Sequence, residues 1–132
     1  MNENDLIYKA LKALPNAYAP YSGYKVGAAL LTAEGQVFTG VNVENASYGL
    51  TICAERNALF AAISSGCRNF VALAVVADGS TAPVPCGACR QVLSEFCGGL
   101  SIIIGDREKH YFKTSLQELF PQPFGSDGRL KE

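Results

Sequence analysis

The sequence has 132 residues, of which 48% are hydrophobic and 17% are charged. This length suits one domain, and the charged fraction falls below the value of about 25% that is typical of soluble domains. With 11 basic and 12 acidic residues, the chain lacks the basic excess that attracts nucleic acids or anionic membranes. The composition excludes a disordered polyelectrolyte and favours a compact fold, with subunit contacts covering some of the apolar surface.

The N-terminal residues, the longest apolar stretch and the cysteines bear on the compartment of the protein. Polar residues at positions 2–5 precede any apolar residue, whereas a secretory signal begins with positive charge and an apolar block. The longest apolar stretch, 70–77, is too short to cross a bilayer. We therefore expect no membrane contact and a cytoplasmic location. In that reducing compartment, the odd set of five cysteines is expected to bind metal or do chemistry.

Hydrophobic spacing, turn residues and caps predict the secondary structure. The expected elements in chain order are a helix over 5–14, strands over 25–32 and 36–41, a polar loop over 42–50, a helix over 53–65, a strand over 70–77, a helix over 86–97, a strand over 101–105, an edge strand over 111–114 and a short final helix capped by Ser115 and Glu118. Strands that alternate with helices indicate a three-layer α/β/α fold. The hairpin of the first two strands predicts a mixed, about five-stranded sheet. Without repeats or linkers, residues 1–132 are expected to form a single domain.

Three cysteines stand at the starts of the two long predicted helices. Cys86 and Cys89 lie three residues apart in the segment Pro-Cys-Gly-Ala-Cys, so their side chains share one helix face. Cys53 begins the other helix. The helix dipole and free amide hydrogens of a first turn lower a thiol pKa. If both helices begin at the same edge of the sheet, three thiolates can converge on one zinc ion.

Three protein ligands leave one position of tetrahedral zinc free for water, which is the arrangement of a catalytic site. Three thiolates weaken the effect of zinc on the pKa of that water, so positive charge nearby would restore it. Arg56 and Arg90, each close after a cysteine, are the candidates. Glu55 follows Cys53 by two residues and can reach metal-bound water, where it would move protons.

The cysteine spacing alone leaves two other sites open. A single Cys-x-x-Cys before a helix is also typical of a thioredoxin-like redox pair. A structural zinc site would add Cys67 or Cys97 as a fourth ligand. Cys97 lies 11 residues past Cys86, roughly 16 Å along a straight helix, and cannot share that ion. Cys67 follows a helix-ending glycine and is interpreted as a spectator.

The two cysteine motifs together resemble the signature of the zinc-dependent nucleoside deaminases, specifically small cytidine deaminases of the three-cysteine type. The motifs are Cys-Ala-Glu at 53–55 and Pro-Cys-Gly-Ala-Cys at 85–89, and matching blocks at 24–30, 40–49 and 89–93 extend the resemblance over nearly the whole chain. It implies hydrolytic deamination of cytidine and 2′-deoxycytidine to uridine and 2′-deoxyuridine with release of ammonia, a step of pyrimidine salvage.

The resemblance also implies a role for each matching residue. Cys53, Cys86 and Cys89 would hold one zinc ion per subunit, while Arg56 neutralises the thiolates. Glu55 would take a proton from zinc-bound water and pass protons to the ring nitrogen and the departing amine. The implied substrate contacts are Asn42 and Glu44 to the ribose hydroxyls, the backbone amide of Ala54 to the pyrimidine carbonyl, Tyr24 beside the ring, and Tyr48 and Phe124 at the site of a neighbouring subunit in a homotetramer. Where this chain has Tyr24, family members often have phenylalanine.

Other deaminases provide the main rival readings. A blasticidin S deaminase shares the zinc signature and size, although the segment 42–49 favours a nucleoside. Deaminases of nucleic acids usually have histidine as first zinc ligand and need a basic groove, and this chain has neither. The single histidine, His110, stands outside every motif and is interpreted as a surface turn residue.

Overall fold

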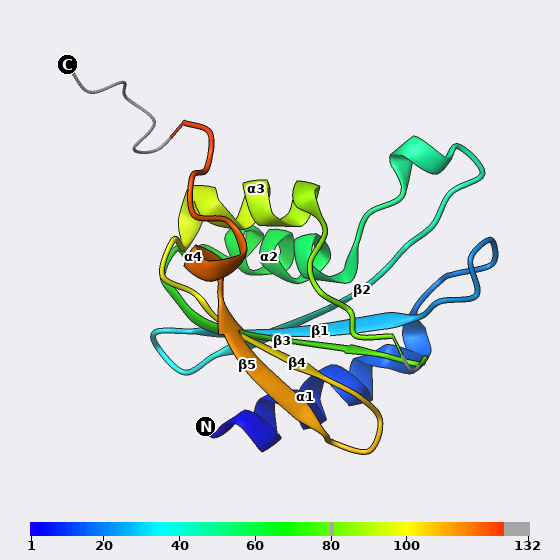
Figure 1. The fold of residues 1–132 in the computed structure, drawn as a ribbon, viewed down its shortest axis with the longest axis horizontal. Helices are drawn as coiled ribbons and strands as arrows, with labels where there is room; N and C mark the ends of the chain where they lie inside the picture. Colours follow the sequence, from blue (N-terminus) through cyan, green and yellow to red (C-terminus); the bar gives the residue numbers. More distant parts are fainter. Residues whose placement is uncertain (80, 126–132) are drawn as a thin grey trace.

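Five strands form one mixed sheet with helices on both faces (Figure 1). The structure is a computed structural model that describes residues 1–79 and 81–125. In chain order the elements are α1 (Glu3–Ala13), the 3-10 turn η1 (Leu14–Asn16), β1 (Val26–Thr32), β2 (Val37–Val41), the 3-10 turn η2 (Tyr48–Leu50), α2 (Ala54–Ser64), β3 (Phe70–Ala77), α3 (Gly87–Phe96), β4 (Ser101–Gly105), β5 (Tyr111–Ser115) and α4 (Leu116–Leu119).

The strand order is β2-β1-β3-β4-β5. The central pair β3 and β4 is parallel, as the intervening helix α3 requires, and the other neighbouring pairs are antiparallel. The mixed, five-stranded sheet predicted from the sequence is therefore confirmed, and β5 is an edge strand as expected. Within the described part of the chain, no helix is long and apolar enough to cross a membrane.

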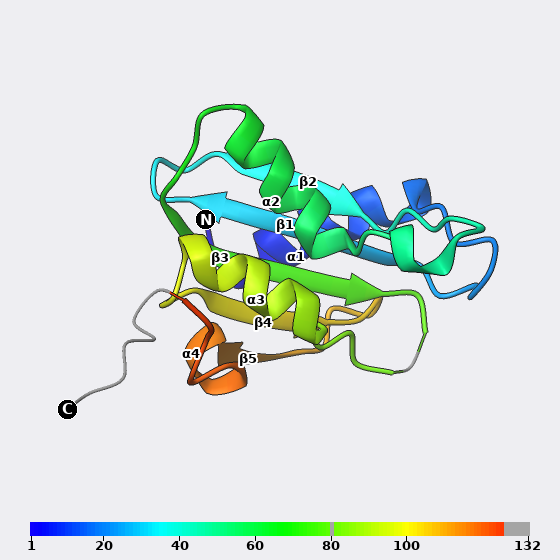
Figure 2. The same ribbon diagram turned by 90° about the horizontal axis from the view of Figure 1, so that it is seen from above.

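The helices form two layers around this sheet. Helix α1 covers one face, whereas α2 and α3 lie side by side on the other, with α4 beyond α3 (Figures 1 and 2). One apolar cluster joins α1 to its face of the sheet through Ile7 and Ala74, and a second, larger cluster joins α2 and α3 to the opposite face through Leu59 and Leu93. This arrangement confirms the three-layer α/β/α fold.

Two glycines in the hairpin allow helices to lie unusually close to the sheet. A Cβ atom at Gly40 in β2 would lie 2.4 Å from the backbone nitrogen of Ala58 and 2.5 Å from the carbonyl oxygen of Ala54, both in α2. On the other face, a Cβ at Gly27 in β1 would lie 2.5 Å from the carbonyl oxygen of Ala10 in α1. Gly40 thus sets how deep the first turn of α2 lies against the sheet.

The element ends differ from the predicted ones where short-range hydrogen bonds decide them. Helix α1 begins earlier than expected, at Glu3, because the Asn2 side chain caps it by accepting from the backbone N–H of Asp5 at 2.9 Å. The predicted loop 42–50 contains the 3-10 turn η2. The hydroxyl of Ser115 caps α4 as predicted, accepting from the backbone N–H of Glu118 at 3.1 Å.

Candidate metal centre and substrate pocket

Two helix starts bring three cysteine side chains together. Cys53 is the N-cap residue of α2, Cys86 is the N-cap residue of α3, and Cys89 lies in the first turn of α3. Their sulfur atoms all lie within 4.8 Å of one another, and the Cys53 and Cys86 sulfurs are 3.7 Å apart. The cluster runs from buried Cys89 to exposed Cys86. Three sulfurs at these distances form a donor set that suits one metal ion with tetrahedral coordination and an affinity for thiolates, such as zinc.

The other two cysteines lie apart from this cluster. The Cys67 thiol donates to the side-chain oxygen of Gln36 at 3.3 Å, and the buried Cys97 thiol donates to the carbonyl of Leu93 at 3.0 Å. Burial raises the pKa of Cys97 to about 12, which keeps this thiol protonated and unreactive. Over residues 1–79 and 81–125, no fourth Cys, His, Asp or Glu joins the three sulfurs, so the arrangement differs from a closed four-ligand site.

Arg56 supplies positive charge to the cluster. Its guanidinium donates to the Cys53 sulfur at 3.6 Å. The hydrogen bond from the Cys89 thiol, with those from Arg56 and Cys86, lowers the pKa of Cys53 to about 5. The same bond to Cys53, together with burial, raises the pKa of Cys89. Of this hydrogen-bonded pair, Cys53 is therefore the sulfur that more readily carries the negative charge.

A buried, unpaired donor tests whether the cluster fits a metal ion. Arg56 Nε is buried and has no hydrogen-bond partner among the described residues. Such an atom normally costs about 1–3 kcal/mol unless an acceptor is supplied. Binding of a metal cation would convert the thiols into thiolates, which accept hydrogen bonds. The charge and donors of Arg56 therefore fit a cluster of metal-bound thiolates.

Glu55 lies in the first turn of α2 beside the sulfurs. Its side chain is 5% exposed, and burial, assisted by the charge of Cys53, raises the pKa of its carboxyl to about 7. A carboxyl that loses and regains its proton near neutral pH can act as both base and acid. The local arrangement thus places a proton carrier next to a candidate metal centre.

A cavity of about 280 Å³ opens beside Glu55 and the cluster. Predicted site residues that line it are Tyr24, Asn42, Glu44, Cys53, Ala54, Glu55 and Cys86. Sequence reasoning missed Pro83 and Val84, which form another part of the wall. Their position directly before the Cys86 motif was the available signal, since residues that precede a ligand commonly line its site.

Asn42 and Glu44 hold the pocket together as well as lining it. The Asn42 amide accepts from the backbone N–H of Val26 at 2.9 Å and donates to the carbonyl of Tyr24 at 2.8 Å. The Glu44 carboxylate accepts from the backbone N–H groups of Tyr21 and Ser22 and from the Ser22 hydroxyl, which lowers its pKa. Each side chain keeps further hydrogen-bonding capacity, one N–H and one lone pair on Asn42 and one lone pair on Glu44.

Comparison with known proteins decides the family of this site. Residues 1–104 match the family described as "Cytidine and deoxycytidylate deaminase zinc-binding region". Curated relatives called cytidine deaminase include proteins from Halalkalibacterium halodurans (48% identical, covering 96% of this chain and 97% of the relative) and Sporosarcina psychrophila (46% identical, covering 96% and 94%). The chain belongs to the cytidine deaminase family.

Solved structures of cytidine deaminases have the same fold. The cytidine deaminase from Burkholderia pseudomallei superposes with a TM-score of 0.90 at 48% identity, over 94% of this chain and 100% of that one. The cytidine deaminase from Mycobacterium tuberculosis superposes with a TM-score of 0.82 at 42% identity, over 96% and 99%. These relatives do not favour the thioredoxin-like and blasticidin S alternatives considered above.

Two predicted substrate contacts of this family member lie outside the cavity of their own chain. Tyr48 is 74% exposed on η2, where its ring meets that of Tyr21 edge to face, with centroids 5.7 Å apart. Phe124 is 85% exposed, and its carbonyl accepts from the side-chain amide of Gln91 at 3.2 Å. Both aromatic side chains are thus available to a second molecule.

Arg90 contacts backbone carbonyls. Its guanidinium donates from Nε to the carbonyl of Pro85 and from Nη1 to the carbonyl of Leu119, both at 2.8 Å. Arg56, by contrast, contacts a sulfur directly. Of the two arginines expected to adjust the charge of the metal site, Arg56 is thus the one whose guanidinium contacts a cysteine sulfur.

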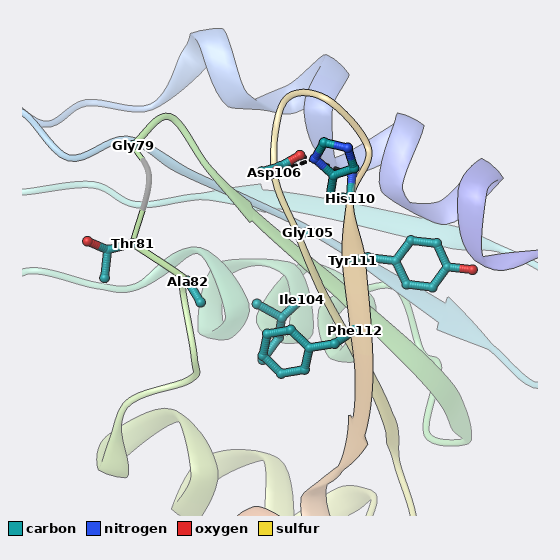
Figure 3. Close-up of a pocket in the computed structure, with 9 residues that line it drawn as sticks. All are labelled: Gly79, Thr81, Ala82, Ile104, Gly105, Asp106, His110, Tyr111 and Phe112. Atoms are coloured by element: carbon teal, nitrogen blue, oxygen red, sulfur yellow. Dashed lines mark hydrogen bonds and ion pairs between the residues drawn. The ribbon is translucent and has the colours of Figure 1, made fainter.

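A second cavity, of about 260 Å³, is lined by residues of β4, of β5 and of the loop between β3 and α3 (Figure 3). Thr81 and Ala82 line this cavity, whereas Pro83 and Val84 line the one beside the cysteines. His110 lies here, with its Nδ1 3.4 Å from the carboxylate of Asp106, and is mostly exposed. The one histidine therefore stands apart from the three-sulfur cluster.

Proposed function

We propose that this chain catalyses the hydrolytic deamination of cytidine and 2′-deoxycytidine to uridine and 2′-deoxyuridine, with release of ammonia, as a step of pyrimidine salvage. The observation that carries the proposal is the three-sulfur cluster beside a buried Glu55, at the wall of a cavity large enough for a nucleobase. Membership of the cytidine deaminase family supports the same reaction.

The proposed cofactor is one zinc ion per subunit, held by Cys53, Cys86 and Cys89. Zinc bound there by three residues supplies an activated water near neutral pH. Three thiolates on one ion carry excess negative charge, and Arg56 offsets it through its contact with Cys53. The unpaired Nε of Arg56 is available for a further hydrogen bond to these thiolates.

Glu55 is the proposed catalytic residue. Its carboxylate takes one proton from the attacking water and delivers it to the pyrimidine ring nitrogen. It then takes the second proton, from the hydroxyl formed on the ring carbon, and delivers it to the departing amine. The reaction uses both forms of the side chain in one cycle, so a pKa near neutrality keeps each proton transfer close to balanced. Burial also keeps bulk water away from these transfers.

The remaining cavity residues orient the nucleoside. Asn42 and Glu44 have the free donor and acceptor capacity that a ribose diol needs, and the backbone N–H of Ala54 is proposed to bind the pyrimidine carbonyl. Because their other polar atoms already hold β1 and the segment 21–22, Asn42 and Glu44 are ordered before substrate arrives. Ordering in advance lowers the entropic cost of binding.

The chain is proposed to form a single domain over residues 1–132 and to assemble as a homotetramer. Tyr48 and Phe124 would then complete the site of a neighbouring subunit, which accounts for two aromatic side chains exposed to solvent in one chain. The reducing cytoplasm stays our prediction for the compartment, and it agrees with five free cysteines in the described residues.

The decisive experiment follows the loss of cytidine absorbance when zinc-loaded protein is added, with blasticidin S and free cytosine as comparison substrates. We expect turnover of cytidine and deoxycytidine, little turnover of cytosine, which lacks the ribose, and loss of activity when a chelator removes zinc. Full activity of metal-free protein would rule out the mechanism, and faster turnover of blasticidin S would reverse the substrate assignment.

The Glu55→Gln variant tests the proton carrier. Glutamine has nearly the same shape but cannot take up a proton, so we expect zinc content to stay near one per chain while kcat falls by about 10²–10⁴-fold. Glu34→Gln, at an exposed turn, is the matched control and should behave as the parent protein. Metal analysis together with steady-state kinetics measures both quantities. A Glu55→Gln protein with near-normal kcat would reject the assigned role.

A further inference from the structure

Arg90 joins two segments that are distant in sequence. It lies in α3 directly after Cys89, and its planar guanidinium reaches the carbonyl of Pro85 through Nε and the carbonyl of Leu119 through Nη1, each at 2.8 Å. Pro85 immediately precedes Cys86, a member of the sulfur cluster. Leu119 is the last residue of α4 and precedes the C-terminal segment that carries Phe124.

Both acceptors have chemical reasons to need such a donor. The last carbonyls of a helix have no partner within that helix, and α4 has only four residues, so Arg90 satisfies an oxygen that the short helix leaves free. Pro85 is buried, and an unpaired carbonyl there would carry a desolvation penalty. Arginine suits two acceptors at once because its donors are held in a rigid plane, which lysine lacks.

The next residue of α3 contacts the same terminal segment. The side-chain amide of Gln91 donates to the carbonyl of Phe124 at 3.2 Å. Arg90 and Gln91 therefore hold residues 119–124 at two points, and Arg90 alone also contacts the loop before Cys86. These three contacts differ from ion pairs, because all three acceptors are backbone carbonyl oxygens.

We infer that Arg90 is a positioning residue that couples the Cys86 loop to the C-terminal segment carrying Phe124, with Gln91 as a second hold on that segment. Any effect of this coupling on turnover rests on the proposed deaminase function, whereas its effects on zinc binding and on amide exchange in residues 119–124 do not. Arg90 acts through hydrogen-bond geometry, and Arg56 supplies the charge.

The test compares zinc affinity and hydrogen exchange in variants of the full chain. Arg90→Met removes both contacts, so we expect zinc affinity, measured by competition with a chromogenic chelator, to fall about 10-fold or more. Amide exchange in residues 119–124 should become faster in the same protein. Arg90→Lys keeps the charge but not the planar pair of donors, so it should resemble Arg90→Met in both measurements.

Two further variants separate the contacts. Gln91→Leu removes only the contact with Phe124, so amide exchange in the C-terminal segment should become faster. Zinc affinity should stay within about twofold, because Gln91 makes no contact with the loop before Cys86. Arg68→Met is the matched control, because Arg68 also donates to two backbone carbonyls, those of Ile63 and Cys67, away from the cluster. It should alter neither measurement.

Several outcomes would overturn the inference. Parent-like zinc affinity in Arg90→Lys would show that Arg90 acts through its charge. Unchanged amide exchange in residues 119–124 of Arg90→Met would show that Arg90 does not couple the two segments. An equal loss of zinc affinity and equally faster amide exchange in Arg68→Met would show that both effects come from general destabilisation of the fold. If Arg90→Met fails to fold, Arg90→Lys and Gln91→Leu carry the same decision. A parent protein without cytidine turnover would refute the proposed function while leaving these two measurements valid.

Discussion

Tyr24 connects the substrate pocket to the segment that forms its opposite wall. Its hydroxyl donates to the carbonyl of Thr81 at 2.9 Å, and Thr81 lies shortly before the wall residues Pro83 and Val84. Burial, helped by the charge of Glu55, raises the pKa of Tyr24, so its hydroxyl stays a donor over the working pH range. The hydroxyl of Tyr24 thus has a definite structural contact.

Tyr24→Phe should loosen this wall without altering the chemistry. Removal of one hydrogen bond to an exposed carbonyl costs little, about 0.5 kcal/mol, so we expect KM for cytidine to rise roughly two- to threefold with kcat nearly unchanged. Tyr8→Phe, on α1 at the other face of the sheet, is the control. Steady-state kinetics measures both. A large fall in kcat at constant KM would instead place the hydroxyl in the proton path.

At the scale of elements, the depth of α2 against β2 sets where Cys53 and Glu55 lie. Gly40 permits that depth because its missing side chain makes room for the backbone of Ala54 and Ala58. Gly27 does the same for α1, which contributes nothing to the cluster. The two glycines thus provide a matched pair on opposite faces of one hairpin.

Alanine at either glycine should destabilise the fold by about 1–3 kcal/mol, because the helix must shift to admit a methyl group. Only Gly40→Ala should also weaken zinc binding, since the displaced backbone is the first turn of α2. Urea unfolding measures the free energy of unfolding, and chelator competition measures zinc affinity. Equal losses of zinc affinity in Gly27→Ala and Gly40→Ala would show that the metal centre responds to overall stability alone.

The ends of an element were predictable from sequence where polar or glycine residues border an apolar run. Strands 70–77 and 101–105 have the expected ends, because each is an apolar run with polar or glycine residues at its borders. Helices α2 and α3 are shorter than predicted by one residue at each end, because Cys53 and Cys86 are N-cap residues with extended backbone and Ser65 and Cys97 are C-cap residues. Side-chain caps such as Asn2 compete locally with hydrophobic spacing, and the spacing does not reveal them.

The candidate site was predictable only where chemistry follows sequence spacing. The three cysteines and Glu55 come from two short motifs, so their residue types and intervals carried the prediction. The direction of the Arg90 side chain is a tertiary property, because its acceptor at Leu119 lies far along the chain. Adjacency to Cys89 suggested a charge role, whereas the observed contacts are to backbone carbonyls.

At the scale of the whole molecule, the low charged fraction corresponds to large apolar side chains that are exposed in one chain. Tyr48, Leu50 and Phe124 are 74%, 65% and 85% exposed in one chain. Tyr48 also borders a cavity of about 200 Å³ that shares Ser22 and Glu44 with the substrate pocket. Large exposed apolar side chains are typical of interaction surfaces, and these three favour the proposed homotetramer.

A mixing experiment tests whether neighbouring chains share a site. Phe124→Ala should raise KM roughly two- to tenfold, the range expected for one aromatic contact with the base. Refolding this variant together with Glu55→Gln should then produce mixed assemblies in which an intact Glu55 faces a neighbour's intact Phe124. We expect activity at low cytidine concentration to exceed the sum of the two separate variants.

The control replaces the Phe124→Ala partner with a chain that carries both substitutions. No site in that mixture has an intact Glu55, so no activity should return, although the assemblies have the same size. Sedimentation of each mixture checks that size independently. Activity equal to the sum of the parts would place Phe124 at its own chain's site, and a monomer in sedimentation would refute the assembly itself. The two readouts therefore distinguish a shared site from mere association, which exposed apolar surface alone cannot do.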